Sequence, residues 1–306
     1  EPTSTSQEVI ELAGSKFSQL SLKDRSKSNK ASEIIESTWA NIITRQGAGG
    51  IDGIPSLINP LDKLTYGWHE GDLILIAART SVGKTAFSCE LALSALKSGK
   101  SVLYFSLEMQ SESVMERMLA NMSGVPIRVM VDKVCTSGQQ EAVENAMTFF
   151  KHTKLWMDDD GTLSVSRIRA KARKLAQQGL DMIVVDYAQL IRPDDPRQSR
   201  EQQVAMISKG MKLLAKELKV PVIMLAQLRR DADEINRCPK LSDLRESGSL
   251  EQDADLVLML WRRGDKPEHD TMLTVAKQRQ GRTGSIELSF KPSIQKFSER
   301  VGERLN

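Results

Sequence analysis

Gly83, Lys84 and Thr85 form the tripeptide of this chain with the clearest chemical meaning. They end the segment AARTSVGKTAF at 77–87, which follows the phosphate-binding pattern GxxxxGK[ST] except that Ala78 stands at the first glycine. In such a loop the lysine neutralises the β- and γ-phosphates of a nucleotide, and the adjacent hydroxyl holds Mg²⁺. A methyl group at the entry of the loop demands only a permissible backbone angle, so the chemistry stays in place.

A phosphate-binding loop needs a buried strand before it and a helix after it, because free N–H groups at the helix start face the phosphates. The sequence supplies an apolar run at 72–77, a turn at 78–84 and a helical stretch from Thr85 to Leu96. A chance GKT at a helix start is the alternative, and this setting disfavours it. We therefore predict a nucleotide site formed by Ser81, Gly83, Lys84, Thr85 and Ala86.

Three polar residues close other apolar runs, and each has a use in hydrolysis. Asp186 ends DMIVVD, from where a carboxylate reaches Mg²⁺; an aspartate that merely forms a turn is the alternative. Glu108 ends VLYFSLE and could accept a proton from attacking water, or instead cap a helix ahead of Ser111. Gln227 ends VPVIMLAQ, where an amide can sense a γ-phosphate. Ligands bind at this carboxyl edge in open α/β sheets.

The elements that must position these residues are short apolar or β-branched runs at 72–77, 101–108, 180–186, 220–227, 254–261 and 271–277. Most lack polar alternation, which is typical of strands buried on both faces. Helical patterns fill several gaps, most clearly at 200–219, and this alternation indicates a largely parallel sheet covered on both sides. The alternating run SIELSF at 285–290 predicts a late edge strand.

The first 50 residues follow a different pattern. Apolar stripes predict helices at 6–20 and 31–46, and the charged stretch at 21–30 is typical of a solvated linker. The stripe of the first helix must be covered, either by its own domain or by a neighbouring subunit. Because the chain begins with Glu-Pro-Thr rather than Met, we expect a fragment that lacks an upstream domain.

Composition sets broad limits on the function. The 306 residues are 40% hydrophobic and 27% charged, as in globular proteins, and the net charge of +3 neither indicates nor opposes a polyanionic ligand. No apolar run approaches the roughly 18 residues of a membrane span, and no signal peptide opens the chain, so we expect a cytoplasmic protein without a membrane partner. Three cysteines and three histidines are scattered along the chain, which disfavours a metal site built from them.

Several of these segments together resemble the C-terminal motor domain of the DnaB-type replicative helicases, a ring-forming family with a RecA-like fold. The matching segments run in order from about Gly49 to Phe297: AARTSVGKTAF, YFSLEM, VVDYAQLI, VPVIMLAQL, SDLRESGSLEQDADLVLMLWR and KQRQGRTG. The stretch LRESGSLEQDAD is the most specific of them. The resemblance implies an α/β fold with a RecA-like P-loop NTPase core, a mostly parallel sheet flanked by helices, and an N-terminal linker helix.

The resemblance also implies a division of the chain. Residues 1–30 would be the linker helix and a flexible linker, with residues 6–20 packed on the adjacent subunit, and residues 31–306 would be the RecA-like ATPase domain. The family's N-terminal helical domain would be absent.

Roles for individual residues follow from the same resemblance. Lys84 and Thr85 would serve ATP and Mg²⁺, Asp186 the metal, Glu108 the attacking water and Gln227 the γ-phosphate.

Two further groups of residues match family motifs away from the phosphate loop. Lys277 and Arg279 match lysine and arginine fingers that reach a nucleotide held by the next subunit; without the resemblance they would be interpreted as a solvated basic strand end. Arg245, Glu246 and Gly248 match a loop inside the ring that grips single-stranded DNA by its backbone.

The implied function is an ATP-driven homo-hexameric helicase that moves 5′→3′ on single-stranded DNA and works with a helicase loader and a primase. A strand-exchange recombinase of the RecA-like class is the nearest alternative, but it should lack LRESGSLEQDAD and the linker helix. A ring scaffold that binds ATP without turnover is the third hypothesis. The set of Glu108, Lys277 and Arg279 disfavours it.

Overall fold

The computed structural model describes residues 30–47, 51–193, 197–228, 237–244, 248–263 and 271–300. The chain divides into two units, Glu1–Gly50 and Ile51–Asn306. In the first unit the described element is the helix α2 (Ala31–Gly47), which confirms the helix predicted at 31–46. The helix predicted at 6–20 lies outside the described residues, and the domain boundary predicted after residue 30 stays a prediction.

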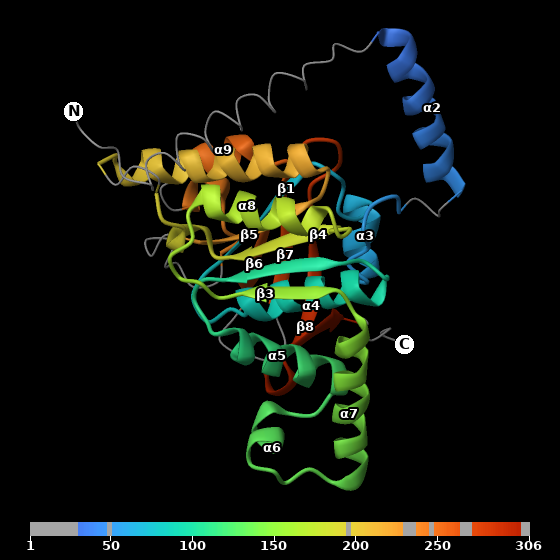
Figure 1. Cartoon of the computed structure of the whole chain (residues 1–306), viewed down its shortest axis with the longest axis vertical. Coiled ribbons are helices and arrows are strands. Elements are labelled where there is room, and N and C mark those ends of the chain that lie inside the picture. The colour runs from blue at the N-terminus through green and yellow to red at the C-terminus, as the bar shows by residue number, and fades with distance from the viewer. Residues whose placement is uncertain are drawn as a thin grey trace, which may run out of the picture. The chain divides into compact units, whose positions relative to one another are not determined.

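Within the described part of the second unit, the central element is a nine-stranded sheet with the order β3-β2-β4-β5-β1-β6-β7-β8-β9 (Figure 1). Its strands are β1 (Leu73–Ala78), β2 (Val102–Ser106), β3 (Leu155–Asp158), β4 (Met182–Asp186), β5 (Val222–Gln227), β6 (Leu256–Arg262), β7 (Thr271–Gln278), β8 (Gly284–Lys291) and β9 (Lys296–Glu299). The strands from β3 to β6 in this order are parallel, and β7, β8 and β9 continue the sheet antiparallel. The predicted, mostly parallel sheet is confirmed.

Helices cover both faces of this sheet. The described helices of this unit are α3 (Asn59–Thr65), α4 (Lys84–Lys97), α5 (Ser111–Ser123), α6 (Ile127–Val131), α7 (Ser137–His152), α8 (Val165–Ala176), α9 (Arg200–Leu218) and α10 (Gly248–Asp253). Alternate residues of β1 belong to two cores: Ile74 and Ile76 pack in the core that holds α4 and α5, and Leu73 and Leu75 in the core that holds α8 and α9. Strands buried on both faces need no polar alternation, which explains their sequence pattern.

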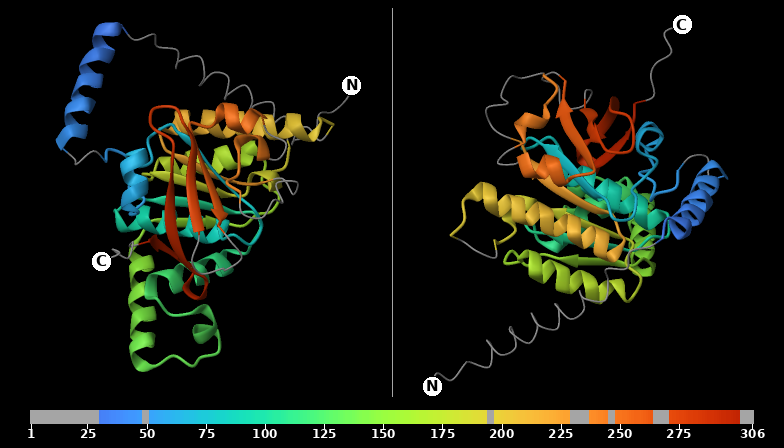
Figure 2. Two further views of the ribbon diagram at one scale, coloured as in Figure 1. Left: turned by 180° about the vertical axis from the view of Figure 1, so that it is seen from behind. Right: turned by 90° about the horizontal axis from the view of Figure 1, so that it is seen from above.

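Two short strands at the margins of the sheet were not predicted. The run SIELSF forms β8, but β8 is not the edge strand, because β9 pairs with it from Leu288 opposite Glu299 to Lys291 opposite Lys296. At the other margin, β3 pairs with β2. Each of these added strands has four residues, too few to show a period in the sequence. The left view in Figure 2 shows the antiparallel strands in orange and red.

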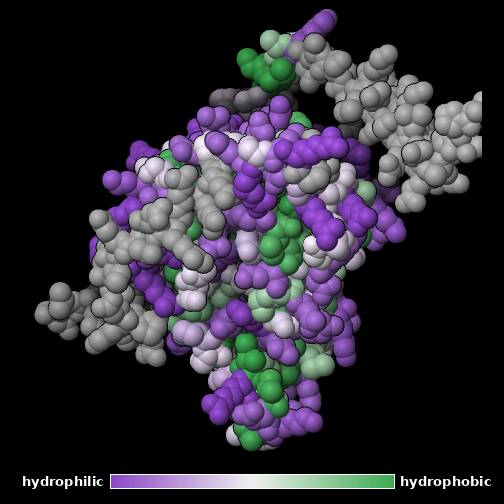
Figure 3. All heavy atoms as spheres, turned by 90° about the vertical axis from the view of Figure 1, so that its left-hand side faces the viewer, coloured by the Kyte–Doolittle hydropathy of each residue, from purple (hydrophilic) through white to green (hydrophobic). Residues whose placement is uncertain are grey.

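A helical lobe built from α6 and α7 extends beyond the sheet at the foot of Figure 1. Val131, Val134 and Met147 are exposed in this lobe, and hydrophobic surface is visible there in Figure 3. None of the described helices is long and apolar enough to cross a membrane.

Candidate functional site

The predicted phosphate loop connects the carboxyl end of β1 to the start of α4. Ser81 and Gly83 have positive φ angles of 63° and 108°, so the backbone turns sharply through the left-handed region. A Cβ atom on Gly83 would lie 3.2 Å from the ring of Phe297, and α4 begins at the next residue, Lys84. The loop therefore requires glycine at position 83, both for its φ angle and for the space beside it.

An aromatic cluster supports this loop. The rings of Phe290 and Phe297 are stacked with centroids 4.3 Å apart, and Phe87 of α4 contacts Phe297 edge-on at 5.2 Å. Phe290 and Phe297 come from β8 and β9. The antiparallel end of the sheet thus holds the first turn of α4 against the strands.

Asp186 lies at the end of β4 and is only 1% exposed. The Thr85 hydroxyl donates a hydrogen bond to Asp186 Oδ2 at 2.7 Å. Its other oxygen, Oδ1, is buried and has no hydrogen-bond partner among the described residues. Thr85 and Asp186 are 101 positions apart in the sequence, whereas an aspartate that forms a turn contacts residues close to it in the chain. A buried carboxylate oxygen without a partner is costly, so its position suits the binding of a cation.

These oxygens fit a magnesium ion. Mg²⁺ prefers oxygen ligands and is usually bound by one or two protein groups together with water and substrate phosphates. The hydroxyl of Thr85 and Oδ1 of Asp186 are the two protein groups that the structure brings together. Among the described residues, no group of three or more His, Cys, Asp and Glu side chains could hold a metal.

The charges of the site respond to its burial. Burial lowers the pKa of Lys84, whereas Asp186 and Glu108 act to raise it. Burial also raises the pKa of Asp186, with the Thr85 hydrogen bond and Lys84 opposing that rise. The Lys84 ammonium lies 4.2 Å from the ring centroid of Tyr187. Because both charges are poorly solvated, a ligand that supplies the opposite charge would bind strongly here.

Glu108 is exposed at the same edge of the sheet. It follows β2, whose last residue, Ser106, pairs with Asp186 of β4. Helix capping does not explain it, because the backbone N–H of Ser111 donates to Asp159 Oδ2 at 2.8 Å instead. The charge of Glu108 contributes to the pKa shifts of both Lys84 and Asp186.

Gln227 completes the group at this edge. It ends β5 opposite Ala78 of β1 and is partly buried. The structure therefore brings the phosphate loop, Asp186, Glu108 and Gln227 together at the carboxyl ends of β1, β2, β4 and β5.

Lys277 and Arg279 lie at the opposite edge of the sheet. Lys277 pairs with Val257 near the start of β6, and β6 runs parallel to β1. At about 3.3 Å per residue, the length of β1 separates this edge from the phosphate loop by roughly 17 Å. The structure does not bring these two residues to the phosphate loop of their own chain.

Both side chains instead contact the end of α10. Arg279 donates to the Gln252 carbonyl at 2.6 Å and to Asp255 Oδ1 at 3.2 Å, and Lys277 donates to the Glu251 carbonyl. Helices leave carbonyl groups unsatisfied at this end, which is where cations bind favourably.

The predicted DNA-contacting residues are mostly outside the description. Arg245 and Glu246 lie outside the described residues, and Gly248 is the first residue of α10. Space is open around Gly248, since a Cβ atom there would meet nothing within 4 Å among the described residues.

Sequence reasoning missed Arg262. This residue ends β6, next to β1, and its guanidinium donates to the Ser81 carbonyl in the phosphate loop at 2.9 Å. The sequence pattern could have identified it, because Arg262 ends an apolar run in the same way as Asp186 and Gln227. Asp255 and Lys212, which contact each other at the other edge, were also missed. They are far apart in the sequence and show no shared pattern.

The chain has close counterparts among known proteins. Residues 53–299 match the family described as DnaB-like helicase C terminal domain. The chain is 37% identical over 300 residues to the replicative DNA helicase DnaB of Geobacillus stearothermophilus, covering 94% of this chain and 66% of that protein. It is 35% identical over 314 residues to DnaB of Buchnera aphidicola subsp. Acyrthosiphon pisum, covering 98% and 68%. The chain thus spans about two thirds of the length of these curated relatives.

Solved structures agree with the sequence matches. One ATPase domain has a TM-score of 0.84 and 30% identity, covering 90% of this chain and 100% of its own. A DnaB-like replicative helicase, solved in a study of its interactions with primase, has a TM-score of 0.80 and 29% identity, covering 96% of this chain and 74% of its own.

Proposed function

Because this chain belongs to the family of DnaB-like helicase C-terminal domains, we propose that it is the ATP-hydrolysing motor of a replicative DNA helicase. The observation that carries the proposal is the contact between Thr85 and Asp186 beside the phosphate loop. It leaves one buried carboxylate oxygen for a metal. This is the arrangement that a nucleotide with Mg²⁺ requires.

The chain's own residues divide the work of hydrolysis. The loop N–H groups and Lys84 would bind the phosphates of ATP, and Thr85 with Asp186 would hold Mg²⁺. Bound Mg²⁺ would neutralise charge on the phosphate oxygens. Glu108 accepts a proton from the attacking water, and the exposure of its side chain at the site edge suits that contact. Gln227 reports whether the γ-phosphate is present.

Lys277 and Arg279 act on a nucleotide held by a neighbouring copy. Their position at the opposite edge of the sheet supports this assignment, because they are about one strand length from their own phosphate loop. A site that needs two copies requires an assembly, and we propose the homo-hexameric ring of the family.

We further propose that Arg245, Glu246 and Gly248 contact the backbone of single-stranded DNA inside that ring. Six copies of a few phosphate contacts add up, so a net charge of +3 for each subunit is sufficient. Primase is a proposed partner because a related helicase was solved with its primase interactions as the subject. A helicase loader and 5′→3′ movement follow from family membership alone.

The proposal is tested by mixing two inactive variants. Glu108→Gln should lower ATP turnover by roughly 10²–10⁴-fold, because it removes the general base. Arg279→Ala should also lower turnover while leaving ATP binding and assembly intact. In mixed rings, an Arg279→Ala subunit with its own Glu108 meets a neighbour with an intact Arg279, so complete sites form again. ATPase activity should therefore recover in the mixture.

Single-stranded DNA and a substrate duplex complete this test. The mixture should show ATP-dependent unwinding. A Lys84→Ala subunit lacks its own phosphate contact, so its phosphate loop should stay inactive when it is mixed with either variant. If rings shown to be mixed recover no ATPase activity, Arg279 does not act on a neighbour's nucleotide. ATP binding without turnover in the unmodified protein, with or without DNA, would support the scaffold hypothesis instead.

A further inference from the structure

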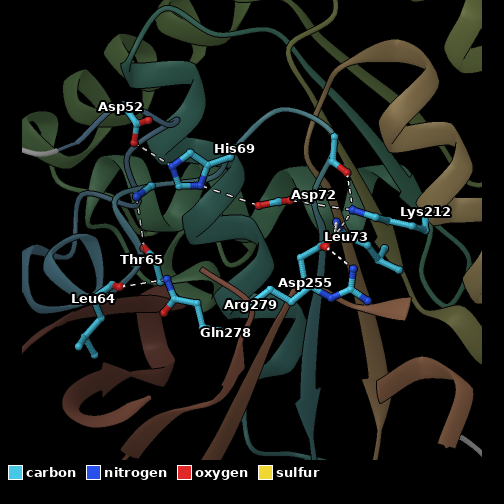
Figure 4. Close-up of polar contacts among 12 residues, drawn as sticks. Asp52, Leu64, Thr65, His69, Asp72, Leu73, Lys212, Asp255, Gln278 and Arg279 are labelled. Carbon is cyan, nitrogen blue, oxygen red and sulfur yellow. Dashed lines mark hydrogen bonds and ion pairs between the residues drawn. The ribbon is translucent and has the colours of Figure 1, made fainter. Parts of the chain in front are cut away.

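A buried charge network lies at the edge of the sheet away from the phosphate loop, and Asp255 is its centre (Figure 4). Asp255 precedes β6 directly. Its Oδ2 accepts a hydrogen bond from the backbone N–H of Leu73 at 2.8 Å and another from the Lys212 ammonium. Its Oδ1 accepts from the Arg279 guanidinium at 3.2 Å. The backbone carbonyl of Asp255 also accepts the backbone N–H of Arg279 at 2.9 Å.

The two cations of this network differ in exposure. The Lys212 side chain is 12% exposed and also donates to the Gly71 carbonyl at 2.7 Å, so it is enclosed by its own chain. The Arg279 side chain is 47% exposed, although Asp255 beside it is 11% exposed. Lys212 therefore compensates the buried charge of Asp255 from the inside, and Arg279 extends from the same carboxylate to the surface.

The contacts of Arg279 engage only some of the N–H donors of its guanidinium. Asp255 Oδ1 and the Gln252 carbonyl engage one N–H on each of its two terminal nitrogens. A guanidinium has five N–H donors in a rigid fork. Among the described residues, the contacts thus account for two donors and leave the others for a ligand at the exposed side. Fixing the group in advance lowers the entropy cost of binding that ligand.

We propose that Asp255 is a positioning residue for Arg279, which it orients toward the nucleotide of the neighbouring copy. This inference rests on the proposed function. Because Asp255 also binds Leu73, the first residue of β1, Arg279 is held relative to the rigid sheet rather than to a loop. A displacement of about 1 Å in a catalytic group can cost about 10²-fold in rate, so such anchoring matters.

Asp255→Asn tests the inference with little change in shape. Asparagine keeps an oxygen for the N–H of Leu73 but loses the charge that attracts Arg279. In the assembled protein we expect ATP turnover to fall by about 10- to 100-fold. The KM for ATP should change by less than about twofold, because ATP binds at the other edge. In an Arg279→Ala background, Asp255→Asn should cause no further loss, since residues that act as a unit are not additive.

Lys212→Met is the matched control. It perturbs the same buried carboxylate but does not remove a contact of Arg279. We expect both Lys212→Met and Asp255→Asn to lower the unfolding midpoint, but Lys212→Met should keep its turnover per assembled subunit. Equal losses of turnover in both variants would show that the network acts through stability alone, which overturns the inference.

The remaining outcomes separate this inference from the proposed function. If Arg279→Ala leaves turnover unchanged, the role proposed for Arg279 itself is wrong. If Arg279→Ala lowers turnover but Asp255→Asn does not, or if their losses multiply, only the positioning role is wrong. A rise in turnover with Asp255→Asn would mean that the contact restrains Arg279, which also contradicts positioning.

Discussion

At the scale of single residues, Lys84 and Asp186 are both ionisable groups whose burial removes solvation from their charged forms. Burial disfavours the charged form of each, lowering the pKa of Lys84 and raising that of Asp186. Each is therefore less stable in the nucleotide-free fold than a solvated charge would be. A nucleotide with its metal would provide the opposite charges, so at the proposed site some folding stability would be exchanged for binding affinity.

The unfolding temperature of Asp186→Asn, measured with and without nucleotide, should show this exchange of stability for affinity. A carboxyl group with a raised pKa contributes stability that is complete below its ordinary pKa of 3.8 and is lost as the pH rises through the raised pKa. At pH 7 the substitution removes a buried charge, and asparagine can still accept the Thr85 hydrogen bond. We expect the nucleotide-free variant to unfold at a higher temperature than the parent. Added ATP with Mg²⁺ should stabilise it less than it stabilises the parent.

Asp181→Asn provides a control of opposite sign. Although partial burial raises it, the pKa of Asp181 is lowered overall by hydrogen bonds from Ser101 and by Lys100. That carboxylate stabilises the fold at pH 7, so its loss should lower the unfolding temperature without changing the response to nucleotide. If Asp186→Asn also lowers the unfolding temperature, the buried charge of Asp186 does not destabilise the fold.

At the scale of elements, α8 and α9 are joined by an ionic contact on top of their shared apolar core. Glu217 of α9 accepts hydrogen bonds from Arg169 at 2.9 Å and from Arg173 at 2.6 and 3.0 Å. Partial burial raises the pKa of Glu217, but the two arginines outweigh burial and lower it overall. The contact thus stabilises the packing of the two helices over the sheet.

Glu217→Gln should destabilise the protein in a pH-dependent manner. With a lowered pKa, Glu217 contributes stability that is present above its ordinary pKa of 4.5 and is lost as the pH falls through the lowered value. At pH 7 we expect a loss of about 1 kcal/mol, allowing for screening of the partly exposed arginines. That corresponds to roughly 2–4 °C in the unfolding midpoint. The difference from the parent should shrink in the acid range.

The exposed Glu141 on α7 supplies the comparison, because Glu141→Gln changes the net charge by the same amount. It should shift the unfolding midpoint much less at either pH. A difference between Glu217→Gln and the parent that stays constant down to acid pH would exclude the ionic contact as its source.

At the scale of the whole molecule, the two halves of the proposed hydrolytic site lie on opposite edges of one sheet. The phosphate loop, Asp186, Glu108 and Gln227 share the carboxyl edge of the parallel strands. Arg279 lies beyond the other end of β1. A single copy cannot bring the two edges together, since the strands between them are buried and rigid.

Turnover should therefore depend on protein concentration. ATPase activity per subunit should be low where sedimentation shows single copies, and should rise to a plateau where assemblies dominate. Arg279→Ala should assemble over the same range without that rise, which separates assembly from completion of the site. Equal activity of single copies and assemblies would contradict a site shared between copies.

The sequence by itself determined which residues make up the proposed nucleotide site, because each part of that prediction rests on a local pattern. Apolar runs that end in Lys84 with Thr85, Asp186 and Gln227 predict strands whose carboxyl ends carry these groups, and parallel strands bring such ends to one edge. The same reasoning predicted most strands of the sheet. It missed Arg262, which has the same pattern, because a basic strand end suggests solvent as readily as a site.

The tertiary structure alone decided the rest. Asp255, Lys212, Leu73 and Arg279 come from four segments, and no spacing in the sequence relates them. The order of β1, β6 and β7 in the sheet, together with the packing of α9 on it, makes them neighbours. The same holds for β9, whose four residues become a strand by pairing with β8. Local patterns record what a segment buries, whereas contacts between distant segments depend on which strands lie side by side.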